Sequence, residues 1–135
     1  MADTTLVKKL GIKPKQRMVI MNAPEGYLEQ LGSLPADVEL ATMPEGSFDW
    51  VHLFVKEKAE LDKYALGAIQ AVKPGGLLWI SYPKKSSKVP TDMTRDVNWD
   101  TVLEAGWRPV TQISIDEVWS ALRFRPTSEV IERKS

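Results

Sequence analysis

Two apolar stretches separated by a helical pattern are the clearest structural signal in the sequence. Residues 48–55 (FDWVHLFV) form one apolar run, and residues 77–80 (LLWI) form a second run directly after a glycine pair. Between them, apolar residues recur at helical spacing: Leu61, Ala65, Ala68, Ile69 and Val72. Strand, helix and strand in this order form a βαβ unit, whose strands lie parallel in a sheet that is covered on both faces. The sequence therefore predicts an α/β fold.

The N-terminal third extends this unit. An apolar strand is predicted over residues 17–22, a short helix over 27–31 and another strand over 38–41. Only residues 43–47 join this last strand to the next one, whereas a parallel crossover usually takes about a dozen residues or more. The strand at 38–41 is therefore either an edge strand with an extended return or an antiparallel strand.

The C-terminal third predicts a helix and a hairpin. Thr91 is a residue type that caps helix N-termini, and the helix is expected to run to Ala105 and to end at Gly106. Polar and apolar residues alternate over 111–115 and again over 119–125. This alternation predicts a closing antiparallel hairpin.

One domain is expected. The 135 residues are 43% hydrophobic, which is enough for one core without a metal or disulfide. We assign residues 1–16 to an N-terminal lead-in, 17–126 to a single α/β domain and 127–135 to a charged, flexible tail. The chain has no cysteine, no signal-peptide pattern at its start and no apolar run near the roughly 20 residues that span a bilayer. We therefore expect a cytoplasmic protein without membrane contact.

The charge balance and the single histidine limit the kinds of ligand and reaction that we expect. The 18 basic and 18 acidic side chains balance, so the field of the whole molecule offers no general attraction to nucleic acid or anionic lipid. The single histidine, His52, lies mid-strand in phase with Trp50 and Phe54, and we expect it to be buried and structural. Histidine-cluster metal sites and Ser-His-Asp catalysis are not expected.

The order of elements and several motifs resemble known families. Phe48-Asp49 at the start of the central strand and residues 73–76 (KPGG) before the next strand resemble class I methyltransferases that bind S-adenosylmethionine, over residues 17–126. The chain is also similar to a bacterial family of unknown function through residues 9–14 (KLGIKP), 83–85 (PKK) and 116–124 (DEVWSALRF). The resemblance implies a three-layer, Rossmann-like (methyltransferase-like) sheet, mostly parallel, ending in an antiparallel hairpin, and it implies no established reaction.

The chain departs from the methyltransferase pattern at the cofactor site. In that family the first strand runs into a loop with two or three glycines, whereas residues 22–26 (NAPEG) hold one glycine and a proline, which has no amide donor. The acidic residue expected after the second strand, where it holds the ribose hydroxyls, is replaced by Thr42 and Met43. The short link over 43–47 also omits a strand and its helices. The resemblance therefore implies a reduced version of the fold.

Polar residues gather at one predicted edge of the sheet. Ligands of open α/β sheets bind outside the carboxyl ends of the strands. The following residues are expected there: Asn22, Glu25, Gly26, Lys56, Tyr82, Lys84, Lys85, Ser86, Ser87, Lys88 and Arg95. In a chain without net charge this clustering predicts an anionic ligand such as a nucleotide, phosphate or carboxylate. The other interpretation is a solvated loop whose lysines are neutralised by Asp92 and Asp96.

Three functions follow from these patterns. We expect a non-catalytic methyltransferase-like domain without a cofactor, which binds a small anionic molecule or a protein partner at the carboxyl edge. Nucleic acid is not an expected partner, because the lysine loop has no aromatic residue for stacking. The alternative is an S-adenosylmethionine-dependent methyltransferase with a divergent loop, in which Asn22, Glu25 and Gly26 contact the cofactor. A second alternative is an assembly module that uses the hairpin, where Trp119 and Arg123 are expected to form an exposed stacking patch.

Overall fold

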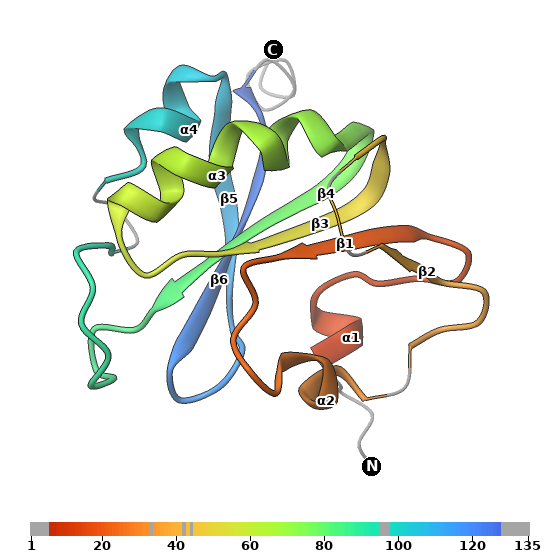
Figure 1. Cartoon of the computed structure of the whole chain (residues 1–135), viewed down its shortest axis with the longest axis horizontal. Coiled ribbons are helices and arrows are strands. Elements are labelled where there is room, and N and C mark those ends of the chain that lie inside the picture. The colour runs from red at the N-terminus through yellow and green to blue at the C-terminus, as the bar shows by residue number, and fades with distance from the viewer. Residues whose placement is uncertain (1–5, 33, 42, 44, 95–97, 128–135) are drawn as a thin grey trace.

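The computed structural model describes residues 6–32, 34–41, 43, 45–94 and 98–127. Within these residues the chain forms one six-stranded sheet of order β2-β1-β3-β4-β6-β5 (Figure 1). The strands are β1 (Arg17–Met21), β2 (Glu39–Ala41), β3 (Phe48–Phe54), β4 (Val72–Pro83), β5 (Trp107–Ser114) and β6 (Trp119–Pro126). β1 to β4 pair in parallel, and β6 pairs antiparallel with both β4 and β5. The predicted mostly parallel α/β sheet with a closing antiparallel hairpin is confirmed.

The direction of β2 settles a question that the sequence leaves open. β2 pairs in parallel with β1, with Arg17 opposite Glu39 and Val19 opposite Ala41. It lies at the edge of the sheet, because its other side has no strand partner among the described residues. Among the described residues β2 is therefore a parallel edge strand, and the antiparallel alternative is wrong.

Helices cover both faces of the sheet. α3 (Lys58–Ala71) and α4 (Asp100–Glu104) lie on one face, and α1 (Leu6–Lys9) and α2 (Tyr27–Leu31) lie on the other (Figure 1). Each pair of helices packs on its own cluster of buried side chains, one that includes Leu61 and Ala65 and one that includes Tyr27 and Trp50. We refer to these as the α3/α4 face and the α1/α2 face. No helix in the described ranges is long and apolar enough to cross a membrane.

The described part of the N-terminal lead-in belongs to the core. Leu10 is 0% exposed, and Ile12 is also buried on the α1/α2 face. The carbonyl oxygen of Leu10 accepts a hydrogen bond from Nε1 of Trp50 and another from Nε1 of Trp79, each at 2.9 Å. Because both indole groups are buried, this one carbonyl satisfies two donors that have no access to water. Residues 6–12 are therefore an integral layer of the fold.

His52 is the buried structural histidine that the sequence predicts. It is 0% exposed, its Nδ1 lies 2.7 Å from the hydroxyl oxygen of Tyr27, and its Nε2 lies 2.6 Å from Oγ of Ser81. Its ring also stacks on Phe54, with 4.2 Å between the ring centroids. Burial lowers the pKa of His52 to about 3, so the imidazole is neutral at physiological pH.

The helix predicted over residues 91–105 is wrong for most of its length. Among the described residues α4 covers only Asp100–Glu104. Thr91 does not cap a helix: its Oγ1 accepts the amide hydrogen of Met93 at 3.0 Å and donates to the carbonyl oxygen of Lys56. Met93 and Trp99 are both buried on the α3/α4 face. The packing of these two side chains thus overrides the helical propensity of the segment.

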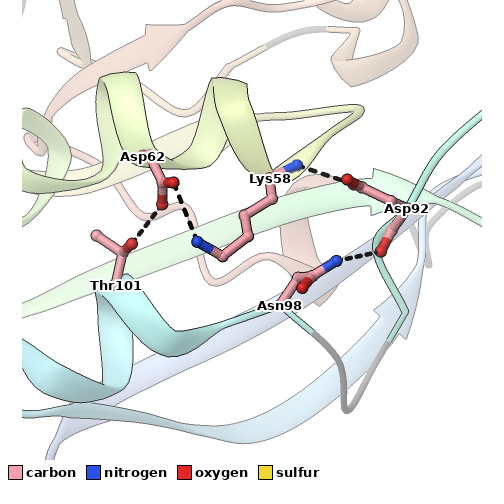
Figure 2. A network of polar contacts seen from close by, with 5 residues as sticks. All are labelled: Lys58, Asp62, Asp92, Asn98 and Thr101. Atoms are coloured by element: carbon pink, nitrogen blue, oxygen red, sulfur yellow. Dashed lines mark hydrogen bonds and ion pairs between the residues drawn. The ribbon is translucent and has the colours of Figure 1, made fainter.

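Asp92 holds the start of α3. Its Oδ1 accepts the amide hydrogen of Lys58 at 2.8 Å, which satisfies one of the N-terminal amides that have no partner inside a helix. The side chain of Asn98 donates to the carbonyl oxygen of Asp92 at 2.6 Å. Asp62 accepts from Lys58 Nζ at 3.1 Å and from Thr101 Oγ1 (Figure 2). Through these contacts, Asp92 and Asn98 before α4, and Thr101 within α4, are linked to the first two turns of α3.

A bulge in β4 places glycines at the amino edge of the sheet. Phe48 pairs with Val72 and Trp50 pairs with Leu77, so Asp49 alone stands opposite residues 73–76. A Cβ atom on Gly76 would lie 2.9 Å from Val72 Cγ2 and 3.0 Å from the carbonyl oxygen of Asp49. The backbone of the bulge therefore packs too closely for a side chain at this position.

Replacement of two glycines is expected to have opposite effects on stability. We expect Gly76→Ala to lower the free energy of unfolding by about 1–3 kcal/mol, because a methyl group there overpacks the bulge. Gly67→Ala, in α3, meets nothing closer than Met21 Cε at 3.9 Å, and we expect a gain of about 0.5–1 kcal/mol from helix propensity. Urea unfolding of both variants measures the difference, and equal stability of the two would contradict the close packing at Gly76.

Candidate functional site

The predicted polar edge contains two separate hollows among the described residues. The first, about 350 Å³, is lined by the loop after β1 and the start of α2; we call it the α2 hollow, and its lining is Ala23, Pro24, Glu25, Gly26, Tyr27, Leu28 and Glu29. The second, about 380 Å³, lies where β4 ends beside the hairpin; we call it the β4 hollow, and its lining is Tyr82, Lys84, Lys85, Ser86, Thr94, Gln112 and Ser120. Only some of the residues expected to form one cluster line a hollow, and these are divided between the two hollows.

Hydrogen bonds of the chain itself bridge the carboxyl ends of β1 and β3. This is the switch point of the sheet, because the neighbours β2 and β3 lie on opposite sides of β1. Asn22, with a left-handed φ of 58°, directs its side-chain amide to the carbonyl oxygen of Phe54 at 2.8 Å and to Glu60 Oε2 at 3.3 Å. The other carboxylate oxygen of Glu60 accepts the amide hydrogen of Lys56 at 2.5 Å. We call this set the switch-point network.

The α2 hollow has an acidic lining. Glu25 and Glu29 are both exposed side chains of this hollow, and no lysine or arginine lines it within the described residues. Gly26 adopts a φ of 88°, which lets the chain turn into the five-residue helix α2. Pro24 contributes no amide hydrogen. Two carboxylates and a missing donor make this hollow a poor place for an anion.

The β4 hollow has a basic rim and a polar floor. Lys84 is held in place by its amide, which donates to the carbonyl oxygen of Val118 at 2.6 Å, and by its Nζ, which donates to Ser114 Oγ at 2.6 Å. Lys85 is exposed at the rim. On the floor the buried hydroxyl of Tyr82 accepts a hydrogen bond from Gln112 Nε2 at 2.9 Å. Two cations, one of them fixed by the hairpin, thus border a hollow of small-molecule size.

The remaining residues of the predicted loop lie elsewhere. Ser87 donates its hydroxyl to the carbonyl oxygen of Lys84 at 2.7 Å and so closes the turn after β4. Lys88 is exposed and does not line the β4 hollow, and Lys56 lies at the switch point through its backbone. Arg95 lies outside the described residues.

The proposed neutralisation of the lysines by acidic residues finds no support at Asp92. Its side-chain carboxylate accepts the amide of Lys58 at the start of α3, as Figure 2 shows. Asp96, the other acidic candidate, lies outside the described residues. Over the part of the chain that the structure describes, no group of three or more histidine, aspartate and glutamate side chains is placed to hold a metal ion.

The prediction of an exposed patch at Trp119 is wrong. Trp119 is 7% exposed and packs edge to face on Phe54, with 5.1 Å between the ring centroids. Alternation correctly places it on the face opposite Leu122, but that face is also covered, by the α1/α2 layer. Arg123 lies opposite Trp79, near the other end of β6, where it lines a different hollow. The two residues therefore do not form one surface for a partner.

Glu60 is a site residue that sequence reasoning missed. It lies in the first turn of α3, where an acidic residue is common because it faces the positive end of the helix dipole. Its spacing of four residues from Lys56 is compatible with a local cap. The contact with Asn22 spans 38 residues, so no local pattern predicts it.

Comparisons with known proteins identify the fold. No family model matches the chain, and no curated protein is similar to it in sequence. Among solved structures, the DhpI complex with SAH is similar at 12% identity over 92% of this chain and 89% of that one, with a TM-score of 0.58. The N-methyltransferase NodS from Bradyrhizobium japonicum WM9, in complex with S-adenosyl-L-homocysteine, is similar at 12% identity over 93% and 90% of the two chains, with a TM-score of 0.56.

A third neighbour belongs to the same class. The ribosomal protein L11 methylase from Lactobacillus delbrueckii subsp. bulgaricus is similar at 11% identity over 89% of this chain and 74% of that one, with a TM-score of 0.58. Identities this low carry information about the fold alone. The chain therefore has the α/β fold of the class I S-adenosylmethionine-dependent methyltransferases.

Proposed function

We propose that this chain is a methyltransferase-fold domain that binds a small anionic ligand in the β4 hollow and does not transfer methyl groups. The observation that supports the proposal is a contrast along the carboxyl edge. The carboxyl ends of β1 and β3 are bridged by the switch-point network, and the hollow beside them is lined by carboxylates, whereas the hollow at the end of β4 is bordered by Lys84 and Lys85.

The switch-point network argues against a bound S-adenosylmethionine. In open α/β sheets the ligand occupies the crevice at the switch point. A cofactor there must displace the bonds of Asn22 to Phe54 and Glu60, and each such bond contributes roughly 0.5–1.5 kcal/mol to stability. The loop after β1 offers few main-chain donors in return, because it has one glycine and Pro24 has no amide hydrogen.

The β4 hollow has the groups that recognise a phosphate or carboxylate. The ammonium groups of Lys84 and Lys85 supply positive charge, and Ser86 supplies a hydroxyl donor at the rim. A volume of about 380 Å³ lies at the lower end of the range of small-molecule sites. The bacterial family of unknown function that the chain resembles includes the Pro-Lys-Lys motif, whose two lysines are the cations of this hollow.

Thermal unfolding in the presence of candidate ligands tests the proposal. A ligand at about 100 times its dissociation constant adds about 2.7 kcal/mol to the stability, which corresponds to a rise of several degrees in Tm. We expect inorganic phosphate or a nucleotide to raise the Tm, and S-adenosylmethionine and S-adenosylhomocysteine to leave it unchanged. A rise with either adenosyl compound would contradict the proposal.

Replacement of the two rim lysines is expected to reduce the response to phosphate. The double variant Lys84→Ala, Lys85→Ala loses both cations of the β4 hollow. We expect each substitution to change the stability by about 0.5 kcal/mol or less, as is usual near the surface. The matched control is Lys88→Ala, which removes an exposed lysine of the same loop that does not line the hollow. An equal loss of the phosphate response in both variants would show a diffuse charge effect and not a site.

A second candidate function is S-adenosylmethionine-dependent methyl transfer. The observation that favours it is the α2 hollow of about 350 Å³ directly after Asn22, at the end of β1. DhpI and NodS, which share the fold, were solved with S-adenosylhomocysteine bound. Under this candidate Asn22, Glu25 and Gly26 contact the cofactor, and the switch-point network has to open. The same thermal series distinguishes the two functions, since only this one requires a response to the adenosyl compounds.

A further inference from the structure

A hollow of about 450 Å³ lies at the amino edge of the sheet, opposite to the edge discussed so far. It is bounded by the segment after α1, by the bulge at the start of β4 and by β6. We call it the amino-edge hollow and define it by Lys9, Gly11, Lys13, Lys73, Gly75 and Arg123. No residue of the switch-point network or of the β4 hollow lines it.

The lining of the amino-edge hollow is strongly basic. It holds four cationic side chains, and Asp49 is the one carboxylate in this lining among the described residues. Asp49 pairs with Nζ of Lys73, and its Oδ2 accepts the amide hydrogen of Arg17 at 2.8 Å. The hydrogen bond from Lys73, together with that from Arg17, holds the pKa of Asp49 below its usual range. Within the described residues, three of the four cations in this lining therefore have no carboxylate beside them, in a chain whose net charge is zero.

Arg123 has an unused donor at this place. It lies on β6 opposite Trp79 of β4 and Thr111 of β5. Its Nε is buried and has no hydrogen-bond partner among the described residues. Burial, and secondarily the positive charge of Arg125, lowers the pKa of Arg123. A buried donor without a partner is uncommon in native proteins and often marks the place of an ion or water.

The backbone beside Arg123 is open to a close approach. Gly75 has a φ of 81°, and a Cβ atom there would meet nothing within 4 Å. Gly11, with a φ of 76°, also lines the hollow, but a Cβ atom there would lie 3.0 Å from Cδ1 of Leu77. Gly75 is therefore the glycine at which the oxygens of an anion can approach the main chain. The bulge also separates this hollow from a second one of about 400 Å³, which Arg123 and Lys73 line as well.

From this geometry we propose that the amino-edge hollow binds the phosphate group of a small phosphorylated molecule. Arg123 lines the hollow, and a guanidinium is a planar donor group that suits the oxygens of a phosphate. Lys73 stands on the bulge, and Lys9 and Lys13 approach from the N-terminal segment. The volume exceeds that of a single phosphate and fits a diphosphate or a nucleotide. This site is independent of the ligand proposed for the β4 hollow, because the two share no residue.

Calorimetric titration with inorganic pyrophosphate tests the site. We expect saturable binding by the wild-type chain. In the variant Arg123→Gln and in the double variant Lys9→Ala, Lys13→Ala we expect a dissociation constant at least about tenfold higher, because charge-assisted hydrogen bonds to phosphate are lost in each. Lys15→Ala is the matched control, because Lys15 is an exposed lysine of the same segment that does not line the hollow. We expect that control to bind as the wild type does, and the double variant at Lys84 and Lys85 to keep the binding event of the amino-edge hollow and to lose only the contribution of the β4 hollow.

The outcomes separate this site from the β4 hollow. Binding that is lost only when Lys84 and Lys85 are replaced would support the β4 hollow and overturn the amino-edge site. The absence of saturable pyrophosphate binding by the wild-type chain would overturn it as well, and so would an equal loss in the Lys15→Ala control. If Arg123→Gln fails to fold, the exposed pair Lys9 and Lys13 decides by itself, and unchanged binding in that variant counts against the proposal.

Discussion

Replacement of Leu10 by alanine is expected to lower the free energy of unfolding by about 2–5 kcal/mol, the usual cost for a fully buried leucine. Leu10 is 0% exposed and packs in the core of the α1/α2 face. The substitution keeps the main-chain carbonyl that accepts hydrogen bonds from Trp50 and Trp79, so it reports the loss of side-chain packing. Urea unfolding followed by tryptophan fluorescence is the measurement. Lys9→Ala is the control, since an exposed neighbour is expected to change stability by about 0.5 kcal/mol or less.

A chain that begins at Lys13 is expected not to fold. Besides Leu10 it lacks the buried Ile12 and the shared carbonyl acceptor, so the buried indole donors of Trp50 and Trp79 lose their partner at a cost of roughly 1–3 kcal/mol each. Together with the lost side chains this approaches or exceeds the roughly 5–15 kcal/mol that stabilises a typical domain. Cooperative unfolding of the truncated chain at the wild-type urea midpoint would show that the N-terminal segment is a lead-in after all.

The sequence predicts those parts of the fold whose signal is local. The strands around Trp50 and Trp79 are read from apolar runs, and α2 is read from its flanking glycines, because the period and the terminating residue lie within a few positions of each other. The N-terminal segment has no such signal. Its burial depends on indole donors 40 and 69 residues away, which meet Leu10 only once the sheet has formed.

The errors have a common physical origin. Thr91 is a residue type that commonly caps a helix, but no helix begins there, because Met93 and Trp99 are buried on the α3/α4 face. For Trp119 the alternation predicts the correct face of the sheet. The error concerns the exposure of Trp119, because nothing near it in the sequence indicates that the α1/α2 layer lies over that face. In both cases tertiary packing decides what a local pattern leaves open.

The polar edge was only partly predictable. The lysines after β4 are visible in the sequence because strand ends and loops follow from the pattern, and two of them do border a hollow. Asn22 instead donates to Glu60, a contact that spans 38 residues and that no local pattern predicts. The amino-edge hollow brings together Lys9, Lys73 and Arg123 from three distant segments. No spacing in the sequence relates these residues, so the structure is needed to find them.

The stability of the protein is expected to fall as the pH drops below about 6.5, because His52 is buried as a neutral ring. Burial lowers its pKa to about 3, whereas in the unfolded chain the pKa is about 6.5. Between these two values the unfolded state binds one proton more than the folded state. The free energy of unfolding therefore decreases with falling pH, by up to about 1.4 kcal/mol per pH unit, and stays level above the unfolded pKa.

Urea unfolding at pH 6.5 and at pH 4.5 measures this effect, which amounts to about 2–3 kcal/mol over the interval. Asp49 and Asp62 have pKa values held below 3.8 by hydrogen bonds, from Lys73 and Thr101 first, so their contribution is lost at still lower pH and does not interfere. The control is His52→Gln, which removes the titrating ring but retains a donor and an acceptor for Tyr27 and Ser81. We expect this variant to be less stable than the wild type at pH 6.5 but to lose little further stability by pH 4.5. If both proteins lose the same amount, His52 is not the group that sets the acid sensitivity of the fold.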